Sequence, residues 1–129
     1  MRPRQPDHQG YTVRDGVRLH WEVYGEGDRT VFFLPTWSIV DSRFWKCQVP
    51  YFARHCRVLT MDGRGNGLSD RPEGAAAYTD ETFAADCLAA ESTNRAHLFS
   101  RRHIHGTSGS RADESKSDRD GKPQSLAAA

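Results

Sequence analysis

Three short stretches of the 129-residue chain hold residue types that could do chemistry. A glycine-rich stretch covers residues 62–72, a Pro-Thr-Trp sequence covers residues 35–37, and Ser108 stands close to glycines shortly after two histidines. In principle these stretches could hold a phosphate, donate a backbone N–H to an oxyanion, and supply a nucleophile. Each chemistry needs a particular backbone geometry, so the spacing of the residues decides which one is possible.

The glycine-rich stretch follows residues 58–61, a run of β-formers that predicts a short buried strand. Gly63, Gly65 and Gly67 allow the backbone after this strand to take positive φ or to approach a neighbouring element closely. A nucleotide-binding loop would need G-x-G-x-x-G at the start of a helix, or Gly-Lys-Ser/Thr, and the stretch has neither. We therefore expect a tight structural loop after a strand and no bound nucleotide.

The same stretch resembles the D-x-R-G-x-G-x-S-x-x-P loop that follows the fourth strand of α/β-hydrolases. The matching positions are Asp62, Arg64, Gly65, Gly67, Ser69 and Pro72. The resemblance implies that this loop is mainly architectural and shapes the floor of the site. It implies no cofactor.

The order of elements before the loop is also similar to the opening of that fold. Residues 11–13 and 17–25 are runs of β-formers on either side of Asp15-Gly16, which predicts an antiparallel edge hairpin with one solvated face. Residues 30–34 are continuously apolar, which is typical of a strand covered on both faces. A helix and a second parallel strand follow. The resemblance implies the N-terminal half of an α/β-hydrolase sheet, with flanking helices.

After the loop, the sequence predicts a helix with Thr79 as its N-cap. Phe83, Cys87 and Leu88 form the apolar stripe that we expect to pack on the sheet. Residues 95–99 then read as the next strand.

Residues 35–37 occupy the place where the family usually has His-Gly-x, whose third residue donates a backbone N–H to the oxyanion. By position Trp37 is the candidate donor, with Thr36 beside it, because Pro35 has no N–H. A subgroup of hydrolase-like proteins reads Leu-Pro-Thr-Trp-Ser at this place. Trp37 could equally be a packing residue on the lid side, and the sequence leaves both interpretations open.

The nucleophile elbow of the family, G-x-S-x-G, is missing. Aligning residues 96–99 with the strand that leads into the elbow puts Ser100, Arg102 and Ile104 where glycine, nucleophile and glycine should stand. Arginine stays protonated and cannot act as a nucleophile. Ser108 is no displaced version, because a glycine follows it directly and no buried strand precedes it. We expect no catalytic residue in this chain.

Histidines and cysteines suggest no further site. His103 and His105 have no third ligand nearby, so we expect a solvated pair and no metal site. His20, His55 and His97 all precede the expected nucleophile and are predicted to be strand-edge or surface residues. Three cysteines without C-x-x-C spacing indicate buried, inert thiols in a reducing compartment, and we expect a cytoplasmic protein. The near-neutral charge of +1 and the lack of an apolar span give no reason to expect nucleic acid or membrane binding.

The composition changes abruptly after Phe99. Between Ser100 and Gly121 the only large aliphatic side chain is Ile104, so we predict that residues 100–129 are disordered. The predicted organisation is a flexible N-terminus over residues 1–9, a partial α/β-hydrolase domain over 10–99, and this tail. A frameshift or misjoined reading frame would produce such a break, a hypothesis that translation of the other two frames would test.

The resemblance implies an ester-hydrolase lineage acting on a small-molecule, ester-like substrate. We expect this chain to be inactive, because nucleophile, acid and histidine are all missing. The alternative is a non-catalytic fragment that serves as a binding or interaction module, or an unstable truncation product. An exposed sheet edge could let such a fragment self-associate. The sequence leaves open whether the lineage is that of an esterase, an epoxide hydrolase or a dehalogenase.

Overall fold

The two β-forming runs around Asp15-Gly16 pair as predicted. In the computed structural model, which describes residues 3–35 and 39–106, strand β1 (His8–Arg14) runs antiparallel to β2 (Val17–Tyr24). Asp15 and Gly16 take φ values of 50° and 75°, the positive values that a two-residue type I′ hairpin turn requires. Because β1 begins at His8, the end of the predicted flexible N-terminus already belongs to the sheet.

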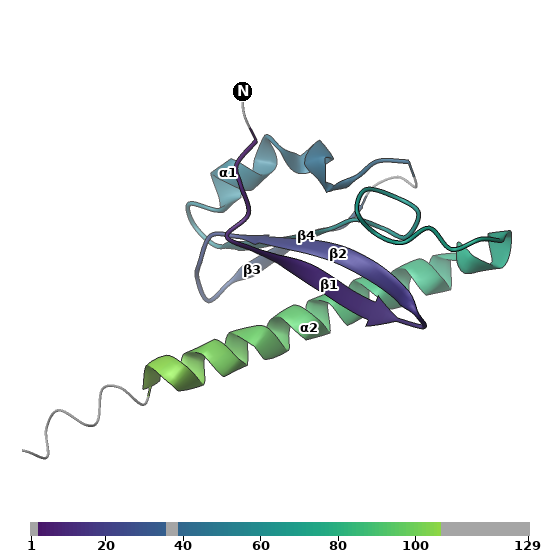
Figure 1. Cartoon of the computed structure of the whole chain (residues 1–129). Coiled ribbons are helices and arrows are strands. Elements are labelled where there is room, and N and C mark those ends of the chain that lie inside the picture. The colour runs from purple at the N-terminus through teal and green to yellow at the C-terminus, as the bar shows by residue number, and fades with distance from the viewer. Residues whose placement is uncertain (1–2, 36–38, 107–129) are drawn as a thin grey trace, which may run out of the picture. The chain divides into compact units, whose positions relative to one another are not determined.

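Four strands form one mixed sheet in the order β1-β2-β4-β3. Strand β4 (Arg57–Met61) pairs antiparallel with β2 and parallel with β3 (Thr30–Phe33), so it lies inside the sheet (Figure 1). The predicted architecture, an antiparallel edge hairpin followed by parallel strands, is therefore confirmed. All of these strands belong to the first of two units, Met1–Arg95 and Ala96–Ala129, which we describe separately.

Helices cover both faces of the sheet within the first unit. One core cluster contains Ala90 of helix α2 (Asp80–Gly106) and residues of β2 and β4: Val17, Leu19, Trp21, Val23, Leu59 and Met61. The second cluster forms around α1 (Gln48–Phe52) and contains Tyr24, Val49, Ala53, Cys56 and Val58. Two short 3₁₀ helices complete the fold, η1 (Ser42–Trp45) before α1 and η2 (Ala75–Ala77) before α2.

Two burial predictions for the strands need correction. The face of β2 that was expected to be solvated carries His20 and Tyr24, which are 3% and 7% exposed, because the loop after β4 and helix α1 cover it. Strand β3, expected to be covered on both faces, has half-buried residues from Val31 to Phe33. The reason is its place at the edge of the sheet, where among the described residues only β4 pairs with it.

Helix α2 begins as predicted but continues much further. Thr79 caps it, since its Oγ1 accepts a hydrogen bond from the Thr82 N–H at 3.2 Å. The strand predicted over residues 95–99 is wrong, because these residues lie in α2. They include no β-branched residue, and Arg95 pairs with Glu91 one turn earlier, which favours a helix. Residues 100–106 complete α2. They are the start of the segment that was predicted to be disordered.

The buried stripe of α2 also differs from the prediction. Leu88 is 67% exposed, whereas Asp86, Ala90 and Asn94 are at most 2% exposed. Phe83 and Cys87 are half-buried beside this stripe, as predicted. The helix thus places the carboxylate of Asp86 and the amide of Asn94 against the sheet. A pattern of hydropathy alone would have predicted that both side chains face solvent. Among the described residues, no helix combines the length and apolar character that a membrane span needs.

The stripe predicts opposite outcomes for two neighbouring residues of α2. Ala90→Leu should lower the free energy of unfolding by about 1–3 kcal/mol, because a larger side chain cannot fit into the closed core. Leu88→Ala should change it by less than about 0.5 kcal/mol, because Leu88 faces solvent. Urea unfolding followed by circular dichroism measures both, and a larger loss for Leu88→Ala would contradict this register of the helix.

Candidate functional site

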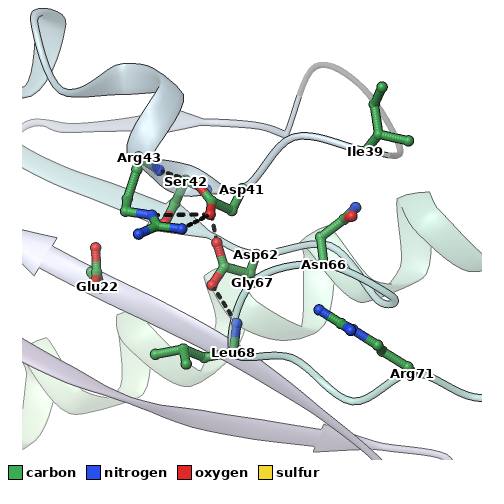
Figure 2. Close-up of a pocket in the computed structure, with 10 residues that line it drawn as sticks. All are labelled: Glu22, Ile39, Asp41, Ser42, Arg43, Asp62, Asn66, Gly67, Leu68 and Arg71. Atoms are coloured by element: carbon green, nitrogen blue, oxygen red, sulfur yellow. Dashed lines mark hydrogen bonds and ion pairs between the residues drawn. The ribbon is translucent and has the colours of Figure 1, made fainter.

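The candidate site lies where the two parallel strands end. The loop of residues 62–72 follows β4, and the segment of residues 39–45 belongs to the connection after β3. Open α/β sheets bind their ligands beyond the carboxyl ends of such strands. Between these segments lies a cavity of about 420 Å³, whose walls also include Glu22 of β2 (Figure 2).

Asp62 is the central residue of this region. Its carboxylate is buried and accepts hydrogen bonds from the backbone N–H groups of Ser42 at 2.7 Å and Leu68 at 3.0 Å. The Nδ1 atom of His20 lies 3.4 Å from the second oxygen, Oδ2. Burial raises the pKa of Asp62, but the His20 contact and the backbone hydrogen bonds outweigh it and lower the pKa to about 2. Asp62 is therefore an ionised tether for three separate segments.

Ser69 connects the loop to β2. Its hydroxyl accepts a hydrogen bond from the His20 backbone N–H at 2.8 Å and donates one to the Asp62 carbonyl at 2.7 Å. The Asp62 N–H in turn donates to the His20 carbonyl at 2.9 Å. The prediction that His20 is a strand-edge or surface residue is thus wrong, because the loop buries it. His55 and His97 are exposed, as predicted.

Two of the three loop glycines are required by the structure. Gly67 has a φ of 50°, and a Cβ atom there would lie 2.2 Å from Asp62 Oδ2. Gly65 has a φ of 84°, and its Cβ would lie 2.9 Å from the ring of Tyr78. Gly63 has no positive φ, and its Cβ would make ordinary contacts at 3.8 Å. The expectation of a special backbone conformation therefore holds for Gly65 and Gly67 but not for Gly63.

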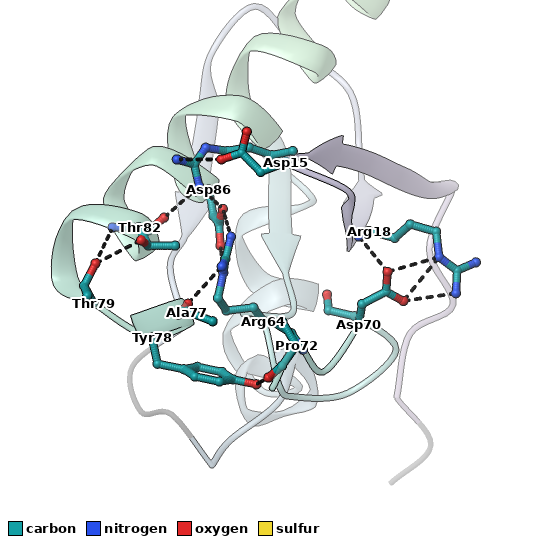
Figure 3. A network of polar contacts seen from close by, with 12 residues as sticks. Asp15, Arg18, Arg64, Asp70, Pro72, Ala77, Tyr78, Thr79, Thr82 and Asp86 are labelled. Atoms are coloured by element: carbon teal, nitrogen blue, oxygen red, sulfur yellow. Dashed lines mark hydrogen bonds and ion pairs between the residues drawn. The ribbon is translucent and has the colours of Figure 1, made fainter. Parts of the chain in front are cut away.

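Arg64 attaches the loop to helix α2 (Figure 3). Its Nε and Nη2 bind the two oxygens of Asp86 at 2.7 and 2.8 Å, and its Nη1 donates to the Ala77 carbonyl at 2.8 Å. Arg14 of β1 reaches the same carboxylate at 2.9 Å. The hydrogen bond to Asp86 raises the pKa of Arg64. Sequence reasoning missed Asp86; an aspartate on the apolar side of an amphipathic helix was the available signal.

The far end of the loop is held at the protein surface. Asp70 accepts hydrogen bonds from the backbone N–H of Arg18 at 2.8 Å and from its guanidinium at 3.0 Å. These bonds, led by the one from the guanidinium, lower the pKa of Asp70. The Tyr78 hydroxyl donates to the Pro72 carbonyl at 2.7 Å. The loop is therefore fixed along its length by hydrogen bonds to β2 and α2.

The other predicted site residues give a less complete picture. Thr36, Trp37 and Ser108 lie outside the described residues, so their roles stay predictions. Ser100, Arg102 and Ile104 lie in α2, where the sequence alignment had placed a strand and its following turn. His103 and His105 also lie in α2. Within the described ranges, no three His, Cys, Asp or Glu side chains gather as a metal site.

Solved structures with this fold are enzymes of several kinds. No family model and no curated protein matches the sequence. An N-acyl homoserine lactone degrading enzyme is 32% identical over 67% of this chain and 32% of its own, with a TM-score of 0.57. The enol-lactonase from Burkholderia xenovorans LB400 is also 32% identical, over 67% of this chain and 33% of its own, with a TM-score of 0.57. The bromoperoxidase from Bacillus anthracis is 25% identical over 68% of this chain and 32% of its own, with a TM-score of 0.61.

These similarities place the chain in the α/β-hydrolase lineage. The described residues form the N-terminal part of that fold, with the edge hairpin, the first parallel strands and their helices. The chain spans about a third of the length of these enzymes.

The glycine geometry predicts a contrast between two neighbouring substitutions. Gly67→Ala should lower the free energy of unfolding by at least about 1–2 kcal/mol, because alanine is strained at positive φ and its Cβ would collide with the Asp62 carboxylate. Gly63→Ala should change it by less than about 0.5 kcal/mol. Urea unfolding of both variants is the measurement, and equal losses would show that the loop backbone is described wrongly.

The low pKa of Asp62 predicts a particular dependence of stability on pH. A carboxyl whose pKa is lower in the folded state stabilises the fold above its ordinary pKa of 3.8, and this contribution is lost as the pH falls toward about 2. The native chain should therefore be more stable than Asp62→Asn at pH 6, and the difference should shrink between pH 4 and pH 2. Urea titrations across this range measure it. Parallel curves would contradict the assignment.

Proposed function

We propose that this chain is a non-hydrolytic member of an ester-hydrolase lineage. In such a lineage a serine attacks the acyl carbon of a small-molecule ester, and water resolves the acyl-enzyme. The observation that supports inactivity is that the positions expected to form the nucleophile elbow lie within α2. They hold Ser100, Arg102 and Ile104, and a protonated arginine stands where the nucleophile should be.

The buried Ser69, His20 and Asp62 do not substitute for a catalytic triad. The Ser69 hydroxyl bonds to two backbone groups, so no imidazole is placed to take its proton. His20 directs Nε2 toward the Gln9 side chain, at 3.4 Å, rather than toward a hydroxyl. With a pKa of about 2, Asp62 is a weak base at neutral pH. These contacts support a structural role for all three residues.

An esterase assay tests this proposal. The purified chain should hydrolyse p-nitrophenyl acetate no faster than the buffer does, because no nucleophile is positioned to form an acyl-enzyme. Turnover that a serine-reactive fluorophosphonate abolishes would overturn the proposal. In that case Ser108→Ala and Ser100→Ala, assayed in parallel, would identify the serine responsible.

A second candidate function is self-association, which the open edge of β3 favours. Among the described residues, β3 pairs only with β4, and its outer backbone groups have no strand partner. Residues 31–33 are half-buried and Leu34, just after the strand, is 45% exposed. Such an edge can accept a strand from another chain. The occupant that we propose is β3 of a second copy.

Sedimentation velocity over a range of concentrations tests this association. The native chain should form dimers or larger species, and Leu34→Lys should raise the monomer fraction because a charge beside the edge opposes strand pairing. Leu88→Lys serves as the matched control, since Leu88 is exposed on α2. A native chain that stays a monodisperse monomer and melts sharply would refute the proposal.

The free thiols support a location in the cytoplasm. Cys47, Cys56 and Cys87 form no disulfide, and the prediction of buried thiols is wrong for Cys47, which is exposed because it lies at the surface before α1. Burial, followed by the charge of Asp86, raises the pKa of Cys87 to about 11, which leaves this thiol protonated and unreactive at neutral pH. Unpaired thiols fit a reducing compartment.

A further inference from the structure

Two hydrogen-bond donors in the cavity at the strand ends have no partner in the part of the chain that the structure describes. The Arg71 guanidinium and the Asn66 side-chain amide line this cavity, and among the described residues neither has a hydrogen-bond or ion-pair partner. The other arginine of the cavity, Arg43, binds Asp41, with Nε and Nη2 at 3.0 and 2.6 Å from Oδ2. Arg71 therefore keeps its charge available to a ligand.

The same cavity exposes two large apolar side chains. Leu68, on the loop between Asn66 and Arg71, is 60% exposed, and Ile39, on the segment after β3, is 78% exposed. Figure 2 shows the Arg71 side chain extending from its backbone toward the Gly67 and Leu68 region. The volume of about 420 Å³ lies within the range of small-molecule sites. Apolar surface beside a free guanidinium suits a ligand with one charged end and one hydrocarbon part.

We propose that this cavity binds a small carboxylate with a short apolar chain. The carboxylate bonds to Arg71, whose guanidinium offers two parallel N–H groups, and to the Asn66 amide, while the chain packs on Leu68. The acidic residues of the cavity have their own partners. Asp41 binds Arg43, and Glu22 accepts the Tyr24 hydroxyl hydrogen at 2.5 Å. Asp62 accepts two backbone N–H groups. Binding needs no catalytic group, so it is independent of hydrolysis.

Titration of the ¹⁵N-labelled full chain with three probes tests the chemistry of the ligand. Hexanoate should shift the backbone resonances of Asn66 and Leu68 and bind about tenfold tighter than hexanamide, because a charged acceptor strengthens the bond to Arg71. Acetate, which lacks the apolar chain, should bind more weakly than hexanoate. Equal affinities for hexanoate and hexanamide, or shifts confined to another surface, would overturn the proposal.

A pair of arginine variants tests the residue assignment. Arg71→Gln should lower the affinity for hexanoate about tenfold and remove its advantage over hexanamide. Arg71 is exposed and has no partner among the described residues, so the variant should keep the native spectrum. Arg95→Gln, which removes an exposed arginine of α2 that pairs with Glu91, should leave the affinity unchanged. An unchanged hexanoate affinity in Arg71→Gln would refute the role of Arg71.

Discussion

The buried carboxylate of Asp62 is the interaction on which the geometry of the cavity depends. It joins three segments that are distant in sequence: the start of η1, the returning loop after β4, and His20 of β2. Removing a carboxylate from water is costly unless its lone pairs find donors, and here backbone N–H groups supply them. Because Asp62 directly follows the fully buried strand β4, the sheet fixes the position of its carboxylate. The backbone N–H groups that bind it must therefore lie at that point.

A second carboxylate, Asp86, fixes the loop from the other side. Two arginines, Arg64 from the loop and Arg14 from β1, meet at this fully buried group. A buried charge without such partners would be strongly destabilising, so loop, helix and edge strand depend on one another. A loop held at Asp62, Arg64 and Asp70 is suited to supporting a cavity wall. Among the described residues, the Asn66 and Arg71 side chains take no part in this support, and these are the side chains that we propose bind a ligand.

The features that were predictable from the sequence are local ones. The hairpin was predictable because Asp15 and Gly16 determine its turn, and the loop because its glycines have a recognisable spacing. His20 and Asp86 were assigned wrongly or missed, because their burial depends on partners far along the chain that a hydropathy pattern does not reveal. The strand expected over residues 95–99 rested on five residues, of which only Ala96, Leu98 and Phe99 are apolar, and so short a stretch fits a strand or a turn of helix equally well. The motif does not show which of its glycines the backbone requires, because Gly65 and Gly67 have positive φ and close contacts, whereas Gly63 has neither.

One property of the Asp62 tether affects how such a scaffold can diversify. The carboxylate contacts the main chain at residues 42 and 68, and at residue 68 it recognises the backbone path rather than the side chain found there. Leu68 consequently projects outward into the cavity wall while its own N–H holds the loop in place. Exchanging that side chain alters the lining without loosening the support beneath it. Proteins built in this way can change what they accommodate by single substitutions, at little risk to the fold.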